Sequence, residues 1–503
     1  MAPSIIGIDL GTTNSCAAIC NESGDVTLIP YRGGEFTIPS VFAIDDKGNE
    51  LLGADALRQW QLNPKNTVFG AKRLIGVAWG TELVAEMRTR VGYGLEQGTE
   101  DSVQIPIAGK NFSLTDISAK ILGKIVEVAS DYLGERVEKA VVTVPAYFTD
   151  RQRQAVRVAG EKTELEILHI INEPTAAALA YGGRQLSNTT VAVYDLGGGT
   201  FDMSIIEIRG RVFEVKATGG DIFLGGIDFD EALIQYILSD FTAKHDVDLT
   251  SDPIAMQRIR DMAERVKVDL SSRQEAPISI PFITMAGGQP LDLNVIVRRE
   301  DLEALVSHLA ERTFDTVAKV IDDAGLDLNS IDEILLVGGQ TRMPMIQERI
   351  TEFFGKAPSK AVHPDEAVAI GAALYAWSLD EKSDLKYQLL DVLAMAIGIE
   401  TAEGKLHHLF KRNESVPNQR QFTFTTHKDN QKDLIMKLFQ GDQEATNENA
   451  ALGEFTFSGL RQSTAGSVRV EVVFNVSSEG ILSLEARDLD TGNQMQQTVR
   501  FGT

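Results

Sequence analysis

Two aspartates, Asp9 and Asp195, each end a short apolar segment and precede a turn of glycine and threonine. The segments form a weak internal repeat: residues 6–13 are Ile-Gly-Ile-Asp-Leu-Gly-Thr-Thr, and residues 192–200 are Ala-Val-Tyr-Asp-Leu-Gly-Gly-Gly-Thr. A strand, a Gly/Thr turn and a returning strand form a hairpin whose backbone N–H groups can converge on phosphate oxygens. Two copies therefore predict two lobes that clamp one phosphate-bearing ligand.

The same two acids suit a magnesium ion. Mg²⁺ keeps much of its water and takes few carboxylates, so one acid at each strand end matches a hydrated Mg–nucleotide. Asp202 is a candidate third ligand. One glycine-rich turn alone is weak evidence, because tight turns need glycine for structural reasons. Two matched turns that carry Asp and Thr are a more specific signal.

A third glycine turn, at residues 336–339, ends an apolar strand and precedes Arg342. Its bare backbone would let a flat base approach, although an ordinary strand-to-helix turn is an equally good interpretation.

The segment from Arg258 to Ser272 has a helical period with an apolar face, so Glu264, Lys267 and Ser271 share another face. That face could bind an adenosine, but charged helix faces are more often simply solvated. From sequence alone, Lys72 is expected to be a surface lysine.

The composition describes a folded protein of more than one domain: 503 residues, 43% of them hydrophobic and 24% charged. The net charge of −24 disfavours binding to nucleic acid or to anionic lipid. Cys16 and Cys20 alone exclude a disulfide framework and are expected to be buried. Since no targeting leader precedes Ile5 and no apolar run approaches the ~18 residues of a membrane helix, the sequence predicts a cytoplasmic location and no membrane partner.

The pattern of apolar and polar residues divides the chain into two parts. From Ile5 to about Leu379, short apolar strands alternate with amphipathic helices, as in α/β layers. Beyond Leu389 the helical period disappears, and residues 468–476 alternate apolar with polar side chains, as in a strand with one buried face. We expect an α/β domain at residues 1–380, a linker at residues 381–392 and an antiparallel β-domain at residues 393–503.

With these residues in view, the chain resembles the DnaK-type chaperones of the seventy-kilodalton heat-shock family over nearly its whole length. Six motifs in family order carry the resemblance: residues 7–15 (GIDLGTTNS), 71–76 (AKRLIG), 142–148 (VTVPAYF), 171–178 (INEPTAAA), 195–202 (DLGGGTFD) and 364–369 (PDEAVA).

The resemblance implies a two-lobed, actin-like ATPase domain that holds ATP or ADP with Mg²⁺, and K⁺ as a further candidate cofactor. The implied catalytic residues are Lys72, Glu173, Asp195 and Thr200, and the implied metal-organising residues are Asp9, Asp195 and Asp202. The implied nucleotide-binding residues are Gly11, Thr12, Thr13, Asn14, Gly197, Gly198, Gly199, Gly225, Gly226, Glu264, Lys267, Ser271, Gly338, Gly339, Arg342 and Asp365.

The resemblance also implies that ATP weakens peptide binding and ADP strengthens it through a population shift. The residues that match this relay are Pro145, Arg153, Leu389, Leu390 and Asp391. The β-domain would bind unfolded or extended apolar peptides at positions that match Ile399, Thr401, Ala402, Phe424, His427, Leu434 and Met436, although Met436 is equally well interpreted as β-domain core. A J-domain co-chaperone and a nucleotide exchange factor would be further partners.

Several positions depart from the family pattern. The last expected strand ends close to Thr503, so no helical lid is expected, and client release should be fast. The arch over the peptide matches Ala402 and His427, a small residue and an imidazole, which predicts altered enclosure and selectivity.

The expected J-protein surface and the linker differ as well. The hairpin at residues 208–212 is basic where the family's is usually acidic, and His169 stands where an arginine is common. We therefore expect a weakened J-domain contact. Gln388 places an amide in a usually apolar linker, and Ile227 replaces a usual acid, which predicts weaker linker docking and a less acidic metal environment.

Three other functions fit parts of the sequence. A small-molecule kinase on the same fold would leave the β-domain without a role, and a nucleotide-dependent filament protein would polymerise with ATP. The third is a lidless, nucleotide-controlled regulator of one partner, which the sequence does not separate from a general chaperone.

Overall fold

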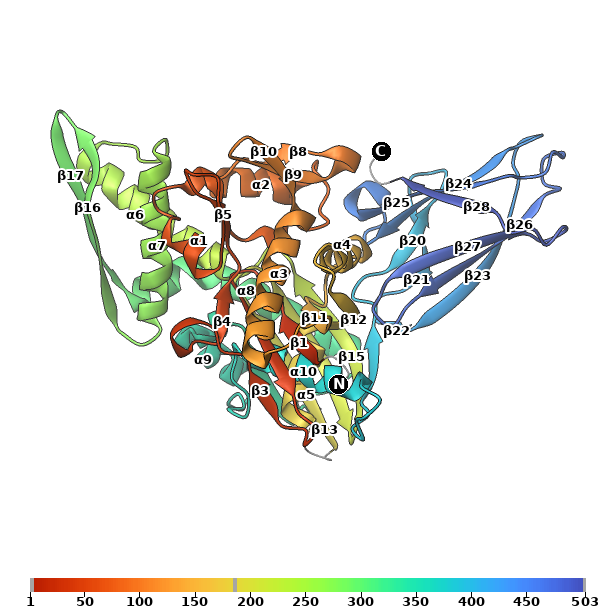
Figure 1. The fold of residues 1–503 in the computed structure, drawn as a ribbon, viewed down its shortest axis with the longest axis horizontal. Coiled ribbons are helices and arrows are strands. Elements are labelled where there is room, and N and C mark those ends of the chain that lie inside the picture. The colour runs from red at the N-terminus through yellow and green to blue at the C-terminus, as the bar shows by residue number, and fades with distance from the viewer. Residues whose placement is uncertain (1–3, 184–187, 501–503) are drawn as a thin grey trace.

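The computed structural model of the 503-residue chain describes residues 4–183 and 188–500. It consists of two α/β lobes followed by a β-domain, with the β-domain at the right of Figure 1 and a long hairpin of lobe II at the left. This order confirms the predicted α/β fold followed by antiparallel β-structure.

Lobe I is built on a six-stranded sheet in the order β12-β11-β1-β2-β3, with β4 also paired to β2. Its strands are β1 (Ile5–Asp9), β2 (Asn14–Cys20), β3 (Val26–Leu28), β4 (Thr37–Pro39), β11 (Lys139–Val144) and β12 (Glu166–Asn172). Two small sheets add β5 (Phe42–Ile44), β6 (Glu50–Leu52) and β7 (Thr67–Val68), and β8 (Glu96–Gln97), β9 (Val103–Ile107) and β10 (Lys110–Ser113). The helices are α1 (Ala54–Arg58), α2 (Glu82–Arg90), α3 (Leu114–Leu133) and α4 (Asp150–Glu161).

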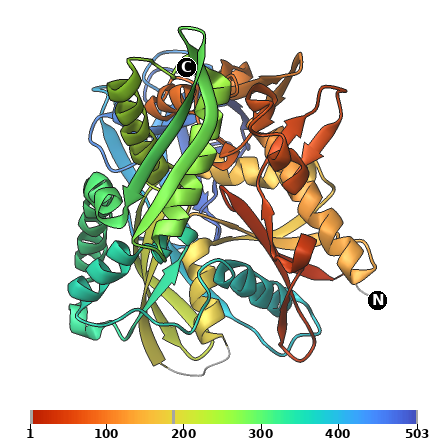
Figure 2. The same cartoon turned by 90° about the vertical axis from the view of Figure 1, so that its left-hand side faces the viewer.

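Lobe II repeats this plan, and Figure 2 shows it beside lobe I. Its main sheet has the order β18-β13-β14-β15-β19-β22. The strands are β13 (Asn188–Leu196), β14 (Phe201–Arg209), β15 (Val212–Asp221), β18 (Glu333–Val337), β19 (Gln388–Val392) and β22 (Ser415–Val416). The helices are α6 (Gly226–His245), α7 (Pro253–Leu270), α8 (Arg299–Ala324) and α9 (Pro344–Phe354), and β16 (Glu275–Ala286) pairs with β17 (Gln289–Arg298) as a separate hairpin.

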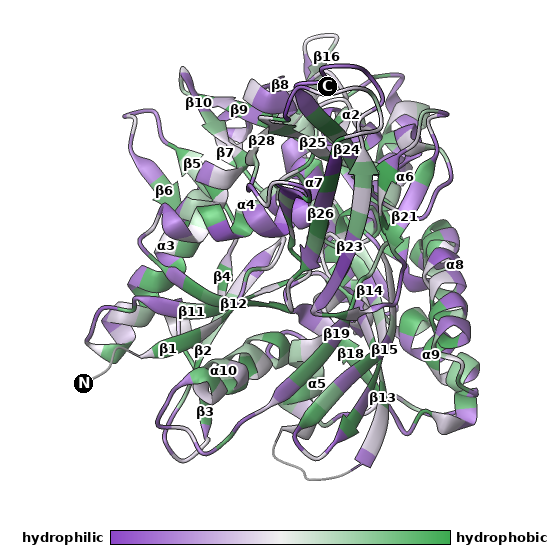
Figure 3. Ribbon diagram, turned by 90° about the vertical axis from the view of Figure 1, so that its right-hand side faces the viewer, coloured by the Kyte–Doolittle hydropathy of each residue, from purple (hydrophilic) through white to green (hydrophobic). Residues whose placement is uncertain are grey.

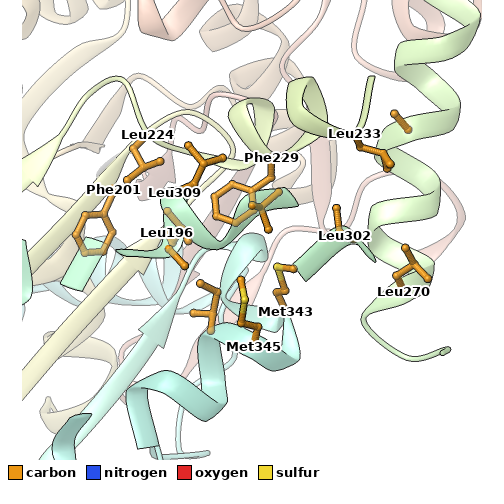
Figure 4. Packing of buried hydrophobic residues seen from close by; sticks show 14 of the residues in the cluster. Leu196, Phe201, Leu224, Phe229, Leu233, Leu270, Leu302, Leu309, Met343 and Met345 are labelled. Carbon is orange, nitrogen blue, oxygen red and sulfur yellow. The ribbon is translucent and has the colours of Figure 1, made fainter. Parts of the chain in front are cut away.

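The hydrophobic colour in Figure 3 is concentrated in central strands such as β1 and β12. In lobe II the buried core reaches the glycine turns, because Leu196, Leu224 and Phe229 all belong to it (Figure 4). Leu196 directly precedes the first turn glycine and Leu224 directly precedes Gly225. Close packing of such side chains holds the adjoining turns in place.

The β-domain contains a five-stranded and a three-stranded antiparallel sheet. The first has the order β21-β20-β24-β25-β28, with β20 (Ile397–Glu400), β21 (Leu406–Phe410), β24 (Asp433–Gln440), β25 (Ala450–Ser458) and β28 (Gln496–Arg500). The second pairs β23 (Asn418–Thr425), β26 (Arg469–Val476) and β27 (Leu482–Asp488). The predicted inward residues of the alternating segment, from Val468 to Val476, are all buried, which confirms the predicted strand.

The segment expected to be a linker ends in a strand of lobe II. In β19, Gln388, Leu389 and Leu390 pair in parallel with β15, and Asp391 and Val392 pair with β22. The polar Gln388 side chain is exposed and its backbone donates to Arg211, so its amide does not prevent docking. The connection between the α/β lobes and the β-domain is thus a strand of the lobe II sheet that lies between β15 and β22.

Helices α5 (Glu173–Gly182) and α10 (Ala367–Leu379) pack against each other between the two main sheets. A Cβ atom on Gly371 of α10 would lie 1.7 Å from the carbonyl oxygen of Ala176, so only glycine permits this contact. Among the helices in the described ranges, none is long and apolar enough to cross a membrane.

Replacing Gly371 with alanine is expected to destabilise the protein by about 3 kcal/mol or more, because the added methyl group meets backbone that cannot rotate away. Denaturant unfolding measures the change. Gly123→Ala is the matched control, since Gly123 also lies inside a helix but its Cβ would meet only Thr163 at 3.6 Å. Equal stability of the two variants would contradict the prediction.

Candidate functional site

A cleft of about 590 Å³ lies between the two lobes. Most residues predicted for the nucleotide site line it. They are Asp9, Gly11, Thr12, Thr13, Asn14, Lys72, Glu173, Asp195, Gly197, Gly198, Thr200, Gly226, Glu264, Lys267, Gly338, Gly339, Arg342 and Asp365.

The two turns of the sequence repeat face each other across this cleft. A Cβ on Gly198 would lie 2.1 Å from Thr13 Oγ1, and a Cβ on Gly199 would lie 2.7 Å from Thr12 Oγ1. The turn at Gly225 packs on the same place, because its Cβ would lie 2.6 Å from the backbone of Gly199. Bare glycine backbone from lobe II therefore meets the threonines of lobe I, as the repeat predicts, in a form suited to phosphate oxygens.

Lys72 is buried, contrary to its expected place on the surface. It follows Gly70, whose left-handed conformation begins a short 3₁₀ turn at Ala71–Arg73. The Lys72 side chain is 7% exposed, and its ammonium lies 2.5 Å from the Glu173 carboxylate, which is 9% exposed. Glu173 opens α5 directly after β12. A buried charge requires a partner or a ligand, and sequence alone gives no signal of this pairing across a hundred residues.

Three further carboxylates surround this ion pair. Burial, together with the charge of Glu173, raises the pKa of Asp9 to about 7 and that of Asp202 to about 7, and it raises the pKa of Asp195 as well. Asp195 and Asp202 lie directly opposite each other on β13 and β14, a placement that is unfavourable for like charges. The buried Oδ2 of Asp202 has no hydrogen-bond partner.

These carboxylates fit a hydrated cation. Within residues 4–183 and 188–500, no three His, Cys, Asp or Glu side chains are grouped so as to hold a metal ion directly. Mg²⁺ keeps several waters and takes few protein ligands, so acids spread around the cleft, one with an unpartnered oxygen, match that ion better than a compact ligand cluster would.

Several residues predicted for the nucleoside also line the cleft. Gly338 has a φ of +82°, and its N–H donates to the Pro364 carbonyl oxygen. Arg342 contacts Asp365 at 2.5 Å. From lobe II, Lys267 lies 2.9 Å from both the Gly226 carbonyl oxygen and the Asp230 carboxylate. The helix face bearing Glu264 and Lys267 is therefore part of the cleft and not a solvated surface.

Not every predicted residue lines the cleft. Ser271 caps the C-terminus of α7 and does not line the cleft. Gly199, Gly225 and Asp202 are likewise not among the lining residues. Lining residues that sequence reasoning missed include Trp60, Phe69, Met87 and Arg90 of lobe I and Asp230, Ile234 and Arg260 of lobe II. They come from separate segments without a shared motif, so no local signal could have identified them.

The predicted relay residues meet at the end of β12. Asp391 Oδ2 accepts hydrogen bonds from Asn172 at 2.9 Å and Thr175 at 3.1 Å. Arg153 donates to Asn172 at 2.8 Å and to the carbonyl oxygens of Ala146 and Phe148. Burial raises the pKa of Asp391, with Arg153 opposing the shift. Pro145 belongs to the same loop, because its carbonyl oxygen accepts the Phe148 N–H.

The β-domain contacts both lobes through its loops. Asp150 accepts the Leu482 N–H at 2.7 Å and its own N–H donates to Gln440 at 3.0 Å. The Ile170 N–H donates to Glu479 at 2.8 Å, and Arg157 pairs with the same carboxylate.

On lobe II, Arg412 donates to the Thr218 carbonyl oxygen at 3.0 Å and lies 3.3 Å from Asp323. The domains are therefore docked on each other in this structure.

The residues predicted to bind peptide lie at the edge of the β-domain core. Ile399, Phe424 and Leu434 are half-buried and pack against it, whereas Met436 is buried within it. Met436 therefore fits the alternative interpretation as core. Thr401, Ala402 and His427 are exposed on two loops.

The two arginines of the hairpin at residues 208–212 both have partners within the protein. Arg209 pairs with Glu207 at 2.6 Å and with Glu214 at 3.6 Å, both on its own hairpin. Arg211 donates to the Asp384 carbonyl oxygen at 3.0 Å. His169 faces the β-domain instead of open solvent, with Nδ1 3.5 Å from Glu479.

Comparison with known proteins agrees with this architecture. The family model described as Hsp70 protein matches residues 5–502. A relative from Solanum tuberosum, "Heat shock 70 kDa protein, mitochondrial", is 45% identical over 498 residues, which are 99% of this chain and 72% of that protein. The chain belongs to the Hsp70 family. It is accordingly an ATP-dependent molecular chaperone, with the two-lobed actin-like domain and β-sandwich that its motifs implied.

One expectation was wrong. The sequence predicted a cytoplasmic location for this Hsp70, but the relative is named as a mitochondrial protein, which contradicts that inference. The family assignment also leaves the kinase and filament functions without support.

Asp150 makes docking of the two domains sensitive to pH. Burial raises the pKa of Asp150 from 3.8 to about 6 in the docked state. The Asp150 carboxyl therefore binds its proton more tightly in the docked state. Its contribution to docking becomes less favourable as the pH rises from 3.8 to about 6 and is constant above about 6. Asp150→Asn keeps an acceptor for the Leu482 N–H but has no charge to desolvate, so it should dock at least about tenfold more favourably at neutral pH.

An interdomain fluorescence-transfer pair in the presence of ATP measures this docking. The advantage of the variant should narrow as the pH falls below about 6, since the wild-type carboxyl is then protonated in the docked state. Exposed Asp131→Asn on α3 is the control and should behave as wild type. Weaker docking of Asp150→Asn at neutral pH would contradict the prediction.

Proposed function

We propose that this Hsp70 hydrolyses ATP in the inter-lobe cleft and uses the nucleotide state to control its affinity for peptide. The observation that carries the proposal is the buried Lys72–Glu173 pair at the end of the cleft where the glycine and threonine turns face each other.

In the proposed reaction, Lys72 places its ammonium against the γ-phosphate, and Glu173 orients the attacking water. The N–H groups of the glycine turns and the hydroxyls of Thr12, Thr13 and Thr200 hold the phosphate oxygens. Phosphoryl transfer depends chiefly on such positioning and on electrostatic stabilisation of the spreading negative charge.

Mg²⁺ would neutralise charge on the β- and γ-phosphates. We assign its water shell to Asp9, Asp195 and Asp202, whose pKa values are raised by burial and by the charge of Glu173. K⁺ is a second candidate ion. Glu264, Lys267, Arg342 and the Gly338–Gly339 backbone would hold the nucleoside.

Peptide binding is proposed for the β-domain edge formed by Ile399, Phe424 and Leu434, with Ala402 and His427 on the adjoining loops. An extended apolar peptide could add backbone pairing to this side-chain contact. The docking of the domains through Asp391 supports a coupling in which the docked form binds peptide weakly. Co-chaperones that act on other Hsp70 proteins are candidate partners.

Lys72→Ala tests the chemistry. The variant should still bind ATP, but single-turnover hydrolysis should fall by ~10²-fold or more, because one transition-state charge contact is lost. Lys65→Ala, at an exposed lysine of the same lobe, should hydrolyse ATP normally. Near-wild-type hydrolysis by Lys72→Ala would refute the assignment.

Asp391→Asn tests the coupling. Asp391 accepts hydrogen bonds at both carboxylate oxygens, from Asn172 and Thr175 at Oδ2 and from the Val392 N–H at Oδ1, and asparagine offers one acceptor oxygen in place of two. The lost bonds should weaken docking, so that ATP lowers peptide affinity by less than in the wild type while basal ATP binding is retained. Fluorescent-peptide binding with ADP and then with ATP measures the ratio. Asp384→Asn, an exposed acid in the same connection, is the control. An unchanged ratio in Asp391→Asn would remove Asp391 from the relay.

A further inference from the structure

One carboxylate of lobe II is held by two arginines of lobe I. Asp228 lies in the first turn of α6 and is 7% exposed. Its Oδ2 lies 2.5 Å from Arg73 Nη2, and its Oδ1 lies 2.6 Å from Arg90 Nη1. The Arg73 side chain is 1% exposed and the Arg90 side chain is 20% exposed. Each carboxylate oxygen thus joins the lobes by a charge-assisted hydrogen bond, which is stronger than a neutral one.

This cluster is connected directly to the phosphate end of the cleft. Arg73 follows Lys72 in the same short turn, and its Nε donates to the Gly199 carbonyl oxygen at 2.8 Å. Asp228 Oδ2 also accepts the Gly225 N–H at 2.7 Å. The position of Asp228 therefore fixes one glycine turn, and Arg73 fixes the other.

Arg90 forms part of the wall of the cleft. It ends α2, pairs with Glu86 one turn earlier, and lines the inter-lobe cleft. It also lines a second cavity of about 480 Å³ between α2, α6 and α8. Without the Arg90–Asp228 contact, α2 would lose its ion pair with α6.

Asp228, and not the residue before it, is the acid that contacts both Arg73 and Arg90. Ile227, the preceding residue, is apolar, and its N–H donates to the Gly198 carbonyl oxygen. Arg88, on the same helix as Arg90, lies instead over the Trp79 ring at 5.3 Å. The contact is therefore specific to Arg90 among the basic residues of α2.

We propose that Arg73, Arg90 and Asp228 form a clamp that keeps the two lobes closed around the phosphates, with Arg90 as the positioning residue that limits nucleotide release. The proposal rests on the proposed ATPase function of the cleft. Arg90 acts through Asp228 and the glycine turns, and has no role in the chemical step itself. Arg90 is the member to test, because removing Arg73 would also leave the Gly199 carbonyl oxygen without the hydrogen bond that Arg73 Nε donates.

Release of labelled ADP, followed by stopped flow, tests the clamp. Arg90→Gln should release ADP about tenfold faster, since removing one partner of a largely desolvated charge pair chiefly raises the dissociation rate. Arg90→Lys retains the charge without the planar fork and should be intermediate. Arg88→Gln makes the same change two residues away and should match the wild type.

A second measurement needs no nucleotide. Spin labels on Leu62→Cys of lobe I and Ile254→Cys of lobe II report the separation of the lobes, because both positions are exposed while Cys16 and Cys20 are buried. Arg90→Gln should shift the nucleotide-free distance distribution to larger values, and Arg88→Gln should leave it unchanged.

The outcomes separate this proposal from the proposed function. Wild-type release rates and distances in Arg90→Gln, in a protein that hydrolyses ATP, would overturn the clamp alone. A wild-type protein that binds ADP but does not hydrolyse ATP would overturn the proposed function, while faster release from Arg90→Gln would still support the clamp.

Discussion

The ammonium of Lys72 lies among more carboxylates than it can neutralise. Glu173 pairs with it directly, while Asp9, Asp195 and Asp202 remain enclosed nearby with pKa values raised by burial and by the charge of Glu173. Such an arrangement opposes folding, because like charges are held together away from water. The rest of the structure must therefore hold these groups in place until a ligand with its cation offsets the repulsion.

Packing behind the turns provides this rigidity. The lobe II core runs up to Leu196 and Leu224, the residues that directly precede two of the glycine turns. The turns then approach so closely that a side chain at Gly225 or Gly198 would collide with its neighbours. Since interiors are close-packed and do not deform gradually, a turn held in this way can present N–H groups to phosphate without reorganising.

The sequence predicted those parts of the site that lie within continuous segments. The repeat around Asp9 and Asp195 predicted both hairpins and their meeting, and the alternation near Val472 predicted a strand of the β-domain. Burial of Lys72 was not predictable from its own segment, because its partner Glu173 comes from another part of lobe I.

The charges of the 208–212 hairpin were also misjudged by reading arginines alone. Arg209 has Glu207 two residues before it, on the same face of the strand, and Glu214 on the adjacent strand. The alternation of strand side chains would have indicated both pairs. Net charge of a segment is thus a poor measure of the field it presents when its acids and bases lie on one face.

Asp202 and the connection to the β-domain are joined by one loop. Asp202 accepts the Tyr147 N–H at 3.2 Å, and the carbonyl oxygens on either side, of Ala146 and Phe148, accept hydrogen bonds from Arg153. Arg153 in turn reaches Asn172, which donates to Asp391. Of these groups, the Ala146 carbonyl oxygen and the Tyr147 N–H belong to one peptide unit. A displacement of Asp202 that carries the Tyr147 N–H with it therefore also moves a hydrogen-bond acceptor of Arg153, whose bond to Asn172 supports Asp391. The position of Asp202 and the docking of β19 are thus connected through the same few hydrogen bonds.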